Sequence, residues 1–261
     1  MSNNSIALSI KDGVAYITLN RPEVFNSFNR EMALELQDTL DTCNENEEVR
    51  AMVITGSGKA FCAGQDLKEV TTPELNPGFK KILEEHYNPI ITRIRSIEKP
   101  IIAAVNGVAA GAGANIALSC DVVVANEHAS FIQAFSKIGL VPDSAGTFFL
   151  PRLIGFQKAS ALMLLGDKVS AQEAERMGMV YKTVSSGDFN AEVENLAETM
   201  ANMPTQALGF TKRLLNESMT NNLEQQLDLE SELQITSAQS EDYAEGVAAF
   251  IEKRKPIFKG K

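Results

Sequence analysis

The chain has 261 residues, of which 44% are hydrophobic and 22% are charged, and its formal net charge is −10. These values are typical of a globular protein with a sizeable core and exclude an intrinsically disordered chain. The acidic balance, without a dense cluster of lysine and arginine, also excludes a nucleic-acid-binding protein, which needs a basic face.

The first half of the chain alternates between strand and helix patterns. Two short runs joined by an Asp-Gly turn predict a β-hairpin over residues 6–19. Helical spacing and β-rich runs predict the further elements in chain order: a helix at 30–43, a strand at 51–55, a helix at 79–97, a strand at 100–105, a helix at 111–119 and a strand at 122–125. This alternation predicts an α/β fold in which helices cover a sheet.

From Lys158 onward, strand signals fade and helix signals dominate. Ser170 and Glu173 form a capping-box pattern that predicts the start of a helix. Residues 191–261 are predicted to be almost wholly helical, with a break at Pro204. One of these helices has an apolar stripe to bury, either on the core of its own chain or on a neighbouring subunit. The stripe consists of Leu223, Leu227, Leu233 and Ile235.

Cysteine and histidine are too few and too scattered for a metal site. Cys43, Cys62 and Cys120 form no CxxC pair, and only His86 and His128 accompany them. We therefore predict that no metal is bound and that the three thiols are reduced, as is usual in the cytoplasm.

Two segments bear on targeting and membrane insertion. Residues 1–10 lack the basic start and apolar run of a signal peptide. Residues 100–120 carry no charge and are long enough to span a bilayer, but Asn106 and Asn115 lie within them. A buried strand followed by a buried helix fits this segment better, so we expect a cytoplasmic protein that does not enter the membrane.

Two segments rich in small residues leave backbone N–H groups uncovered. Residues 60–67 follow a strand and a glycine turn, and residues 106–114 lead from a buried strand into the N-terminus of a helix. Free N–H groups at such a terminus favour an oxyanion, and two donors that converge on one carbonyl form an oxyanion hole. Each segment taken alone also fits a tight turn built of small residues.

Asp143 is the third feature that points to chemistry. It follows Pro142 and precedes Ser144, with apolar residues on both sides. A poorly solvated carboxylate has a raised pKa and is a candidate proton acceptor. The alternative is that Asp143 caps a helix that begins near Ser144.

Taken together, these segments resemble the crotonase (enoyl-CoA hydratase/isomerase) superfamily. The resemblance covers nearly the whole chain, from Leu19-Asn20-Arg21-Pro22 to the terminal residues 243–261. The segments between them that carry it are 26–28, Gly56, 61–67, 100–113, 120–121, Phe131, 139–146, 151–153 with Gly155, and 170–178. It implies binding of an acyl-CoA thioester, whose coenzyme A is part of the substrate, and no separate cofactor.

The resemblance also implies the architecture of the chain. Residues 1–195 would form a ClpP/crotonase-like spiral of ββα units. Residues 196–261 would form a helical region that mediates trimerisation, giving a homotrimer or a hexamer of two trimers.

The same resemblance assigns roles to individual residues. The N–H groups of Ala63 and Ala112 would form the oxyanion hole, with Gly111 and Gly113 on either side of Ala112. Phe258 and Lys261 would reach the coenzyme of a neighbouring subunit. The other residues expected to contact the acyl-CoA are Arg21, Lys59, Gln65, Asp66, Leu67, Asn115 and Phe135.

Departures from the hydratase pattern favour an isomerase. Enoyl-CoA hydratases hold water between two glutamates, and Asn115 and Phe135 occupy the corresponding positions here. Asp143 stands where isomerases of the superfamily carry a single acidic residue. One base is enough to remove the proton α to the thioester and return it two carbons away.

Residues 107–118 and 134–155, with Tyr87-Asn88-Pro89, most resemble isomerases of bacterial phenylacetate catabolism that act on a ring epoxide. A dehalogenase of the superfamily also uses an aspartate at this position, but it needs a tryptophan in its pocket and this chain has none. Two alternatives stay open, an enoyl-CoA hydratase with unusual residues and a non-catalytic protein that binds coenzyme A.

Overall fold

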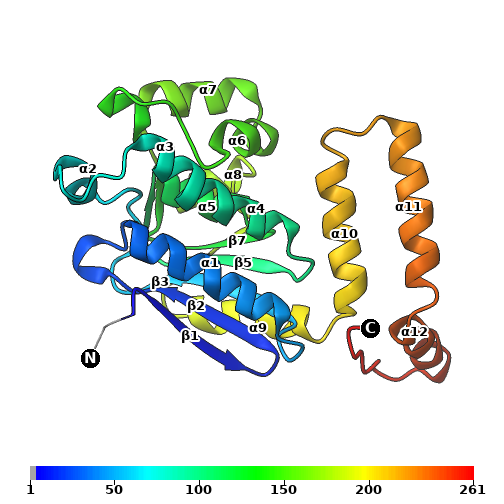
Figure 1. Ribbon diagram of the computed structural model, residues 1–261. Coiled ribbons are helices and arrows are strands. Elements are labelled where there is room, and N and C mark those ends of the chain that lie inside the picture. The colour runs from blue at the N-terminus through cyan, green and yellow to red at the C-terminus, as the bar shows by residue number, and fades with distance from the viewer. Residues whose placement is uncertain (1–3) are drawn as a thin grey trace.

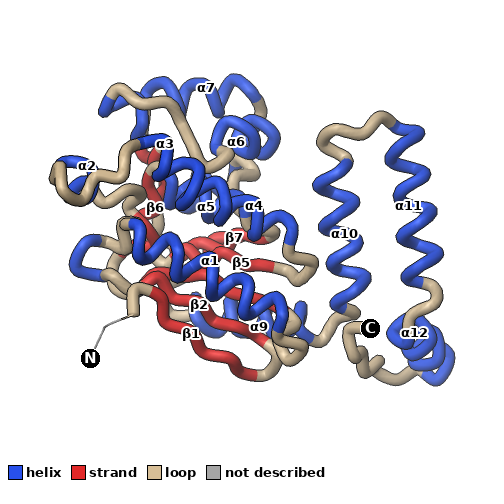
Figure 2. Tube along the Cα trace, in the orientation of Figure 1, coloured by secondary structure: helices blue, strands red, loops and turns tan. Residues whose placement is uncertain are grey.

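The computed structural model describes residues 4–261, in which two β-sheets lie at the centre and helices surround them (Figures 1 and 2). The first three residues of the predicted spiral core, and of the segment judged to lack a signal peptide, lie outside the described residues. No helix within 4–261 is both long enough and apolar enough to cross a bilayer.

The larger sheet has six strands in the order β1-β2-β3-β5-β7-β10. These strands are β1 (Ile6–Lys11), β2 (Val14–Leu19), β3 (Ala51–Gly56), β5 (Ile101–Val105), β7 (Val122–Asn126) and β10 (Lys182–Val184). β1 and β2 form the predicted antiparallel hairpin, and every other pair in this sheet is parallel. Asp12 and Gly13 at the hairpin turn both have positive φ, as an Asp-Gly turn requires.

The smaller sheet has four strands in the order β4-β6-β8-β9. They are β4 (Ala60–Cys62), β6 (Val108–Ala110), β8 (Ser130–Ile132) and β9 (Lys168–Ser170). Each of β3, β5 and β7 in the larger sheet is followed by a strand of the smaller sheet and then by helical structure. This threefold repetition is the predicted spiral of ββα units.

The larger sheet is covered on both faces because its side chains alternate along each strand. Met52 and Ile54 of β3 pack into the main core with α1 (Arg30–Glu45), α4 (Asn88–Ser96) and α5 (Ala112–Ser119). Ala51 and Val53 point to the opposite face, where α9 (Phe189–Ala201) covers them. The sheet is therefore buried between two layers of helices.

The helix predicted over 79–97 contains a π-helical turn. It consists of α3 (Phe79–Lys81), the π turn η2 (Ile82–Tyr87) and α4. Pro89 has no N–H to donate to the carbonyl of Glu85, and the buried amide of Gln37 donates to that carbonyl instead, at 2.8 Å. The proline therefore accounts for the changed helix geometry beside Tyr87.

The remaining helices include one that follows a strand the sequence did not predict. They are η1 (Pro22–Val24), α2 (Leu67–Thr71), η3 (Ala134–Ile138), α6 (Gly146–Ile154), α7 (Phe156–Leu165) and α8 (Ala171–Arg176). Ser170 caps α8 as predicted, because its hydroxyl accepts from the N–H of Glu173 at 3.2 Å. The strands β9 and β10 correct the expectation that strands end before Lys158.

Three C-terminal helices lie beside the core (Figure 1): α10 (Thr205–Glu217), α11 (Leu223–Ser237) and α12 (Glu241–Glu252). The predicted boundary between 195 and 196 falls inside α9, which packs on the sheet through both Val193 and Ala197. We therefore place the end of the core at Ala201. Of the predicted apolar stripe, only Leu233 is buried on its own chain, while Leu223, Leu227 and Ile235 are exposed.

Candidate active site

A cavity of about 470 Å³ opens between η2, the start of α5 and the loop that carries Asp143. Most of its wall is apolar, and Gln65, Tyr87 and Asp143 supply its polar side chains. The apolar side chains in the wall are Ala63, Leu67, Val70, Phe79, Ile82, Ala112, Ala134, Phe135, Ile138 and Leu140. An apolar wall with a few convergent polar groups is typical of a small-molecule site.

Two glycines let the backbones that line this cavity approach one another closely. β4 and β6 pair in parallel, and a Cβ on Gly64 would lie 3.0 Å from the carbonyl oxygen of Ala110. A Cβ on Gly113 would lie 2.4 Å from the carbonyl oxygen of Cys62. Gly64 also has a φ of +92°, which disfavours any other residue. Glycine is thus required at these two positions by close backbone contact.

The free N–H groups beside the cavity belong to Gln65 and Ala112. Within the described chain neither N–H has an acceptor, and the N–H of Ala112 lies at the start of α5. The N–H of Ala63 donates to the carbonyl of Phe25 at 3.0 Å. The prediction that Ala63 supplies an oxyanion-hole donor is therefore wrong, because the segment at Phe25 already uses this group.

Asp143 faces the cavity from the loop between η3 and α6. Burial raises its pKa to about 6, and the hydroxyl of Ser144, which donates to Oδ1 at 2.9 Å, opposes that rise. The alternative that Asp143 caps a helix is wrong, since α6 begins at Gly146 with Ala145 at its cap position and without a side-chain cap. The carboxylate is therefore available for chemistry.

Gln65 is held by hydrogen bonds at both ends of its side-chain amide. The hydroxyl of Tyr87 donates to Oε1 at 2.8 Å, and Nε2 donates to Glu69 Oε2 at 2.7 Å. Burial raises the pKa of Tyr87 well above its ordinary range, so the phenol stays neutral. Tyr87 was not predicted as a site residue. The signal in the sequence that could have located it is Pro89, whose ring accounts for the π turn beside it.

Arg21 and Asp66 lie in a separate hollow next to the cavity. Arg21 Nη2 and Asp66 Oδ2 are 2.9 Å apart, and the Asp66 carboxylate also caps α2 by accepting from the N–H of Lys68 at 3.0 Å. Lys59 is exposed on the loop before β4 and lines neither of these two hollows.

Phe135 and Gly111 belong to the cavity, whereas Asn115 does not. Asn115 is 1% exposed, and its amide is used by Gln133 at 2.7 Å and by the carbonyl oxygen of Asp143 at 2.9 Å. The prediction that Asn115 contacts the acyl-CoA is therefore wrong. Gln133, which was missed, is buried and supports Asn115.

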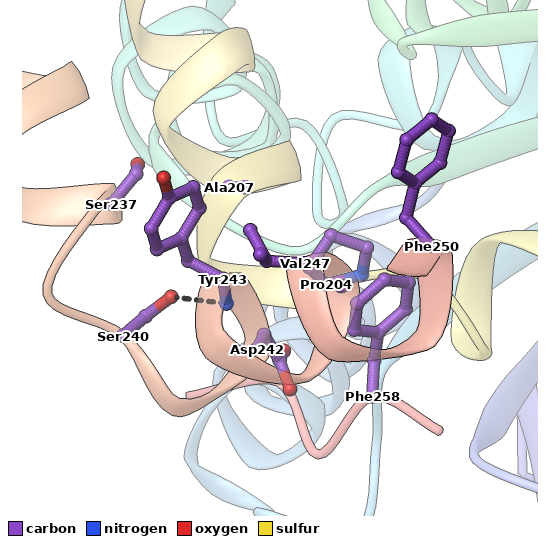
Figure 3. A pocket seen from close by; sticks show the side chains of 10 residues that line it. Pro204, Ala207, Ser237, Ser240, Asp242, Tyr243, Val247, Phe250 and Phe258 are labelled. Atoms are coloured by element: carbon purple, nitrogen blue, oxygen red, sulfur yellow. Dashed lines mark hydrogen bonds between the residues drawn. The ribbon is translucent and has the colours of Figure 1, made fainter. Parts of the chain in front are cut away.

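A second apolar hollow lies at the C-terminal helices (Figure 3). Phe258 lines it together with Tyr243 and Val247 of α12. Asp242 borders the hollow, but its carboxylate accepts from the N–H groups of Lys259 and Gly260 at 2.6 Å and 2.7 Å. Among the described residues that line the hollow, Asp242 is the only carboxylate, and these two bonds tie it to the C-terminal segment.

Phe258 and Lys261 were predicted to contact the coenzyme of a neighbouring subunit. The carbonyl of Lys261 accepts from the N–H of Asp242 at 3.1 Å, so the terminus is tied to α12. In Figure 1 the C-terminus lies at α12, at the opposite side of the molecule from α2 and α3. Within one chain, Phe258 and Lys261 are therefore remote from the Asp143 cavity.

The chain therefore forms a spiral of ββα units, and the cavity lies where the two sheets meet the helices that follow them. This architecture defines the class of crotonase-fold proteins. Residues 9–261 match the enoyl-CoA hydratase/isomerase family, and the chain belongs to that family.

Relatives at similar identity carry the names of different reactions. The chain is 44% identical to the 1,2-epoxyphenylacetyl-CoA isomerase of Escherichia coli (strain K12) over 97% of both chains. It is also 44% identical, over the full length of both, to a Rhodobacter capsulatus protein named "Probable enoyl-CoA hydratase". A crystal structure of an enoyl-CoA hydratase from Polaromonas sp. JS666 matches with a TM-score of 0.90 and 34% identity, over 97% of this chain and 99% of that one.

Proposed function

We propose that the protein is an acyl-CoA isomerase in which Asp143 moves a proton while backbone N–H groups stabilise a thioester enolate. One observation carries the proposal: among the described residues that line the cavity, Asp143 is the only acidic side chain. Its pKa of about 6 leaves it ionised at neutral pH yet basic enough to accept a proton.

The N–H groups of Gln65 and Ala112 are the donors that we assign to the thioester oxygen. Both are free of protein acceptors in the part of the chain that the structure describes, and a Cβ on the intervening Gly64 would lie 3.6 Å from the nitrogen of Ala112. Donors fixed in place before the reaction stabilise the developing charge, and loss of one typically raises the barrier by about 3 kcal/mol.

The proton shift then follows from one base. The Asp143 carboxylate removes the α-proton of a 3-enoyl thioester, the electron pair of that C–H bond forms the double bond between the α-carbon and the carbonyl carbon, and the carbonyl π electrons move to the enolate oxygen. When the enolate collapses, the γ-carbon takes the proton back from Asp143, leaving a 2-enoyl thioester. The step is redox neutral, so the reaction requires no cofactor beyond the coenzyme A of the substrate.

The same residues argue against hydration. A hydratase of the superfamily holds water with two glutamates, and here Phe135 presents a ring to the cavity while Asn115 is buried outside it. Neither residue can act as the second acid or base that water addition requires.

The substrate that we propose is 1,2-epoxyphenylacetyl-CoA, converted to an oxepin-CoA, with migration of enoyl double bonds as a second activity. The name of the Escherichia coli relative supports this choice. So does the cavity wall, in which Phe79 and Phe135 offer flat apolar surfaces to a ring. An enoyl-CoA hydratase and a non-catalytic protein that binds coenzyme A are the alternatives.

The test compares three reactions: rearrangement of the epoxide, migration of the double bond in a 3-enoyl-CoA, and addition of water to crotonyl-CoA. The proposal expects the first two to be fast and the third to be slow. Asp143→Asn should lower double-bond migration by at least about 10²-fold, because it removes the base. Asp38→Asn, an exposed acid on α1, is the matched control and should change nothing.

Fast hydration combined with intact migration in Asp143→Asn would overturn the proposal. Binding of coenzyme A thioesters without turnover of any of the three substrates would favour the non-catalytic alternative.

We also propose that the protein is cytoplasmic and forms a trimer or a hexamer. Cys43, Cys62 and Cys120 are all buried and free, which suits a reducing compartment. Large apolar side chains stay exposed on α11 and α12, among them Leu223, which is 75% exposed, and Phe250, which is 86% exposed. Such a surface on a single chain favours burial against another copy.

A further inference from the structure

Two buried amides connect the core to the loop that carries Asp143. Gln133 Nε2 donates to Asn115 Oδ1 at 2.7 Å, and Asn115 Nδ2 donates to the carbonyl oxygen of Asp143 at 2.9 Å. Gln133 is 4% exposed and Asn115 is 1% exposed. Asn115 lies within α5, whose first residue carries one of the proposed oxyanion donors. The helix α5 therefore contributes both a contact to the loop of the base and a proposed donor to the enolate oxygen.

The loop needs such support because its backbone is strained. Ser144 and Ala145, directly after Asp143, have φ values of +50° and +57°, in the left-handed region that non-glycine residues rarely adopt. Each such residue costs free energy and persists only where the surroundings enforce it. Ala145 at the start of α6 also has no side-chain cap that would fix the turn.

Asn115 contacts this loop at a second point. A Cβ on Gly146 would lie 2.3 Å from Asn115 Nδ2, so only glycine lets the loop close over the amide. The amide thus donates to the loop just before the two strained residues and packs against the backbone just after them. Both ends of the strained segment are held by a single side chain.

We infer that Asn115 is a positioning residue that fixes the direction in which the Asp143 carboxylate enters the cavity, with Gln133 as its support. The inference rests on the proposed role of Asp143 as the base. Hydratases of the superfamily carry a glutamate that holds water at this position, whereas Asn115 here would hold the loop that carries the base. A carboxylate there has no hydrogen to donate, and it would repel the carbonyl oxygen of Asp143.

Two variants test this role. Asn115→Ala removes the donor to the loop. Gln133→Met removes the donor to Asn115 with little change in volume, and it discards an Oε1 atom that has no partner in the described chain, so folding should tolerate it. The matched control is Asn126→Ala at the end of β7, a buried asparagine that accepts from the N–H of His128 at 3.0 Å and lines none of the hollows described above.

The first readout is turnover of a 3-enoyl-CoA. Misplacing a catalytic group by about 1 Å can lower the rate by about 10²-fold, so kcat should fall by roughly that factor in Asn115→Ala, with KM unchanged. Gln133→Met should lower kcat in the same direction by a smaller factor. Asn126→Ala should keep the wild-type kcat even if it lowers the stability of the fold.

The second readout does not depend on activity. The pKa of the Asp143 carboxyl is followed by ¹³C NMR, with Asp143→Asn to assign its signal. Tyr87, which stays neutral, and Ser144 on the loop itself are the groups that face this carboxyl from η2 and from its own loop. A released loop gains solvent, so the pKa should fall from about 6 toward the ordinary value of 3.8 in Asn115→Ala.

A folded Asn115→Ala protein with wild-type kcat and an unshifted pKa of Asp143 overturns the inference. If Asn115→Ala does not fold, the same pair of results in Gln133→Met overturns it. The proposed function fails separately, when Asp143→Asn keeps full activity. If Asn115→Ala shifts the pKa of Asp143 but keeps the wild-type kcat, Asn115 supports the loop, and its role in positioning the base is refuted.

Discussion

Asp143 keeps its proton in the folded chain to a higher pH than in water, and this has a consequence for stability. Below its ordinary pKa of 3.8 the carboxyl is protonated in both the folded and the unfolded chain. As the pH rises from 3.8 to about 6, the unfolded chain ionises first, so the stabilisation that protonation gives the folded chain is lost across this window.

Asp143→Asn should therefore stabilise the folded protein at neutral pH while it abolishes isomerisation. The expected gain is about 1–3 kcal/mol in the free energy of unfolding, since one pKa unit corresponds to about 1.4 kcal/mol and partial solvation reduces the effect. Urea unfolding at neutral pH and near pH 3.8 measures it, and the gain should disappear at the lower pH. A constant difference between the two pH values would contradict the assignment.

At the scale of residues, the sequence predicted which segments form the site but not which of their backbone N–H groups are free. Residues 60–67 and 106–114 do meet at the cavity, and Asp143 does face it. Which N–H is free, however, depends on a contact with residues far away in the sequence. The carbonyl of Phe25 accepts from the N–H of Ala63, whereas the N–H of Gln65 has no acceptor within residues 4–261, and no local pattern around Ala63 predicts this pairing.

At the scale of elements, the π turn η2 sets the position of Tyr87 in the cavity wall. Its geometry depends on Gln37, which is 7% exposed and whose Nε2 donates to the carbonyls of Glu85 and His86 at 2.8 Å and 3.3 Å. Gln37→Leu would leave both carbonyls, of which that of His86 is buried, without this donor. We expect a loss of about 1–3 kcal/mol in the free energy of unfolding, measured by urea titration.

The control for Gln37→Leu is Gln172→Leu, whose amide also donates to a backbone carbonyl, that of Glu127 at 3.0 Å, but at an exposed position. Water replaces such a donor, so the change should stay within about 0.5 kcal/mol. Equal losses in the two variants would show that the π turn does not depend on Gln37.

Long elements with strong periodicity were predictable, and the short strands were not. The helix at 30–43 and the hairpin at 6–19 match α1 and the β1-β2 pair closely. β9 and β10 have three residues each and lie at the edges of their sheets, so pairing with β8 and β7 decides their conformation. Three residues are too few for an alternating pattern to rise above its surroundings.

At the scale of the whole molecule, the three C-terminal helices carry apolar side chains that one chain does not bury. Phe250 and Ile251 of α12 are 86% and 73% exposed, and Ile235 of α11 is 62% exposed. The C-terminus, which is Lys261, lies with α12 at the opposite side of the molecule from α2 and α3 (Figure 1), and Phe258 lines the hollow at α12. Assembly is therefore the route by which these residues would reach a coenzyme, that of a neighbouring subunit.

Phe250→Asp should weaken the proposed assembly, because a charge would have to be buried in the interface in place of an apolar ring. Light scattering should give the wild type a mass of three or six times 28.4 kDa, and the variant should shift toward the single-chain mass. If Phe258 and Lys261 of one chain contribute to the site of its neighbour, KM for the acyl-CoA should rise as assembly is lost, with a smaller change in kcat. Ile10→Asp, at an exposed position of β1, is the control and should stay assembled. A wild-type protein with the mass of one chain and full activity would refute both the assembly and the shared site.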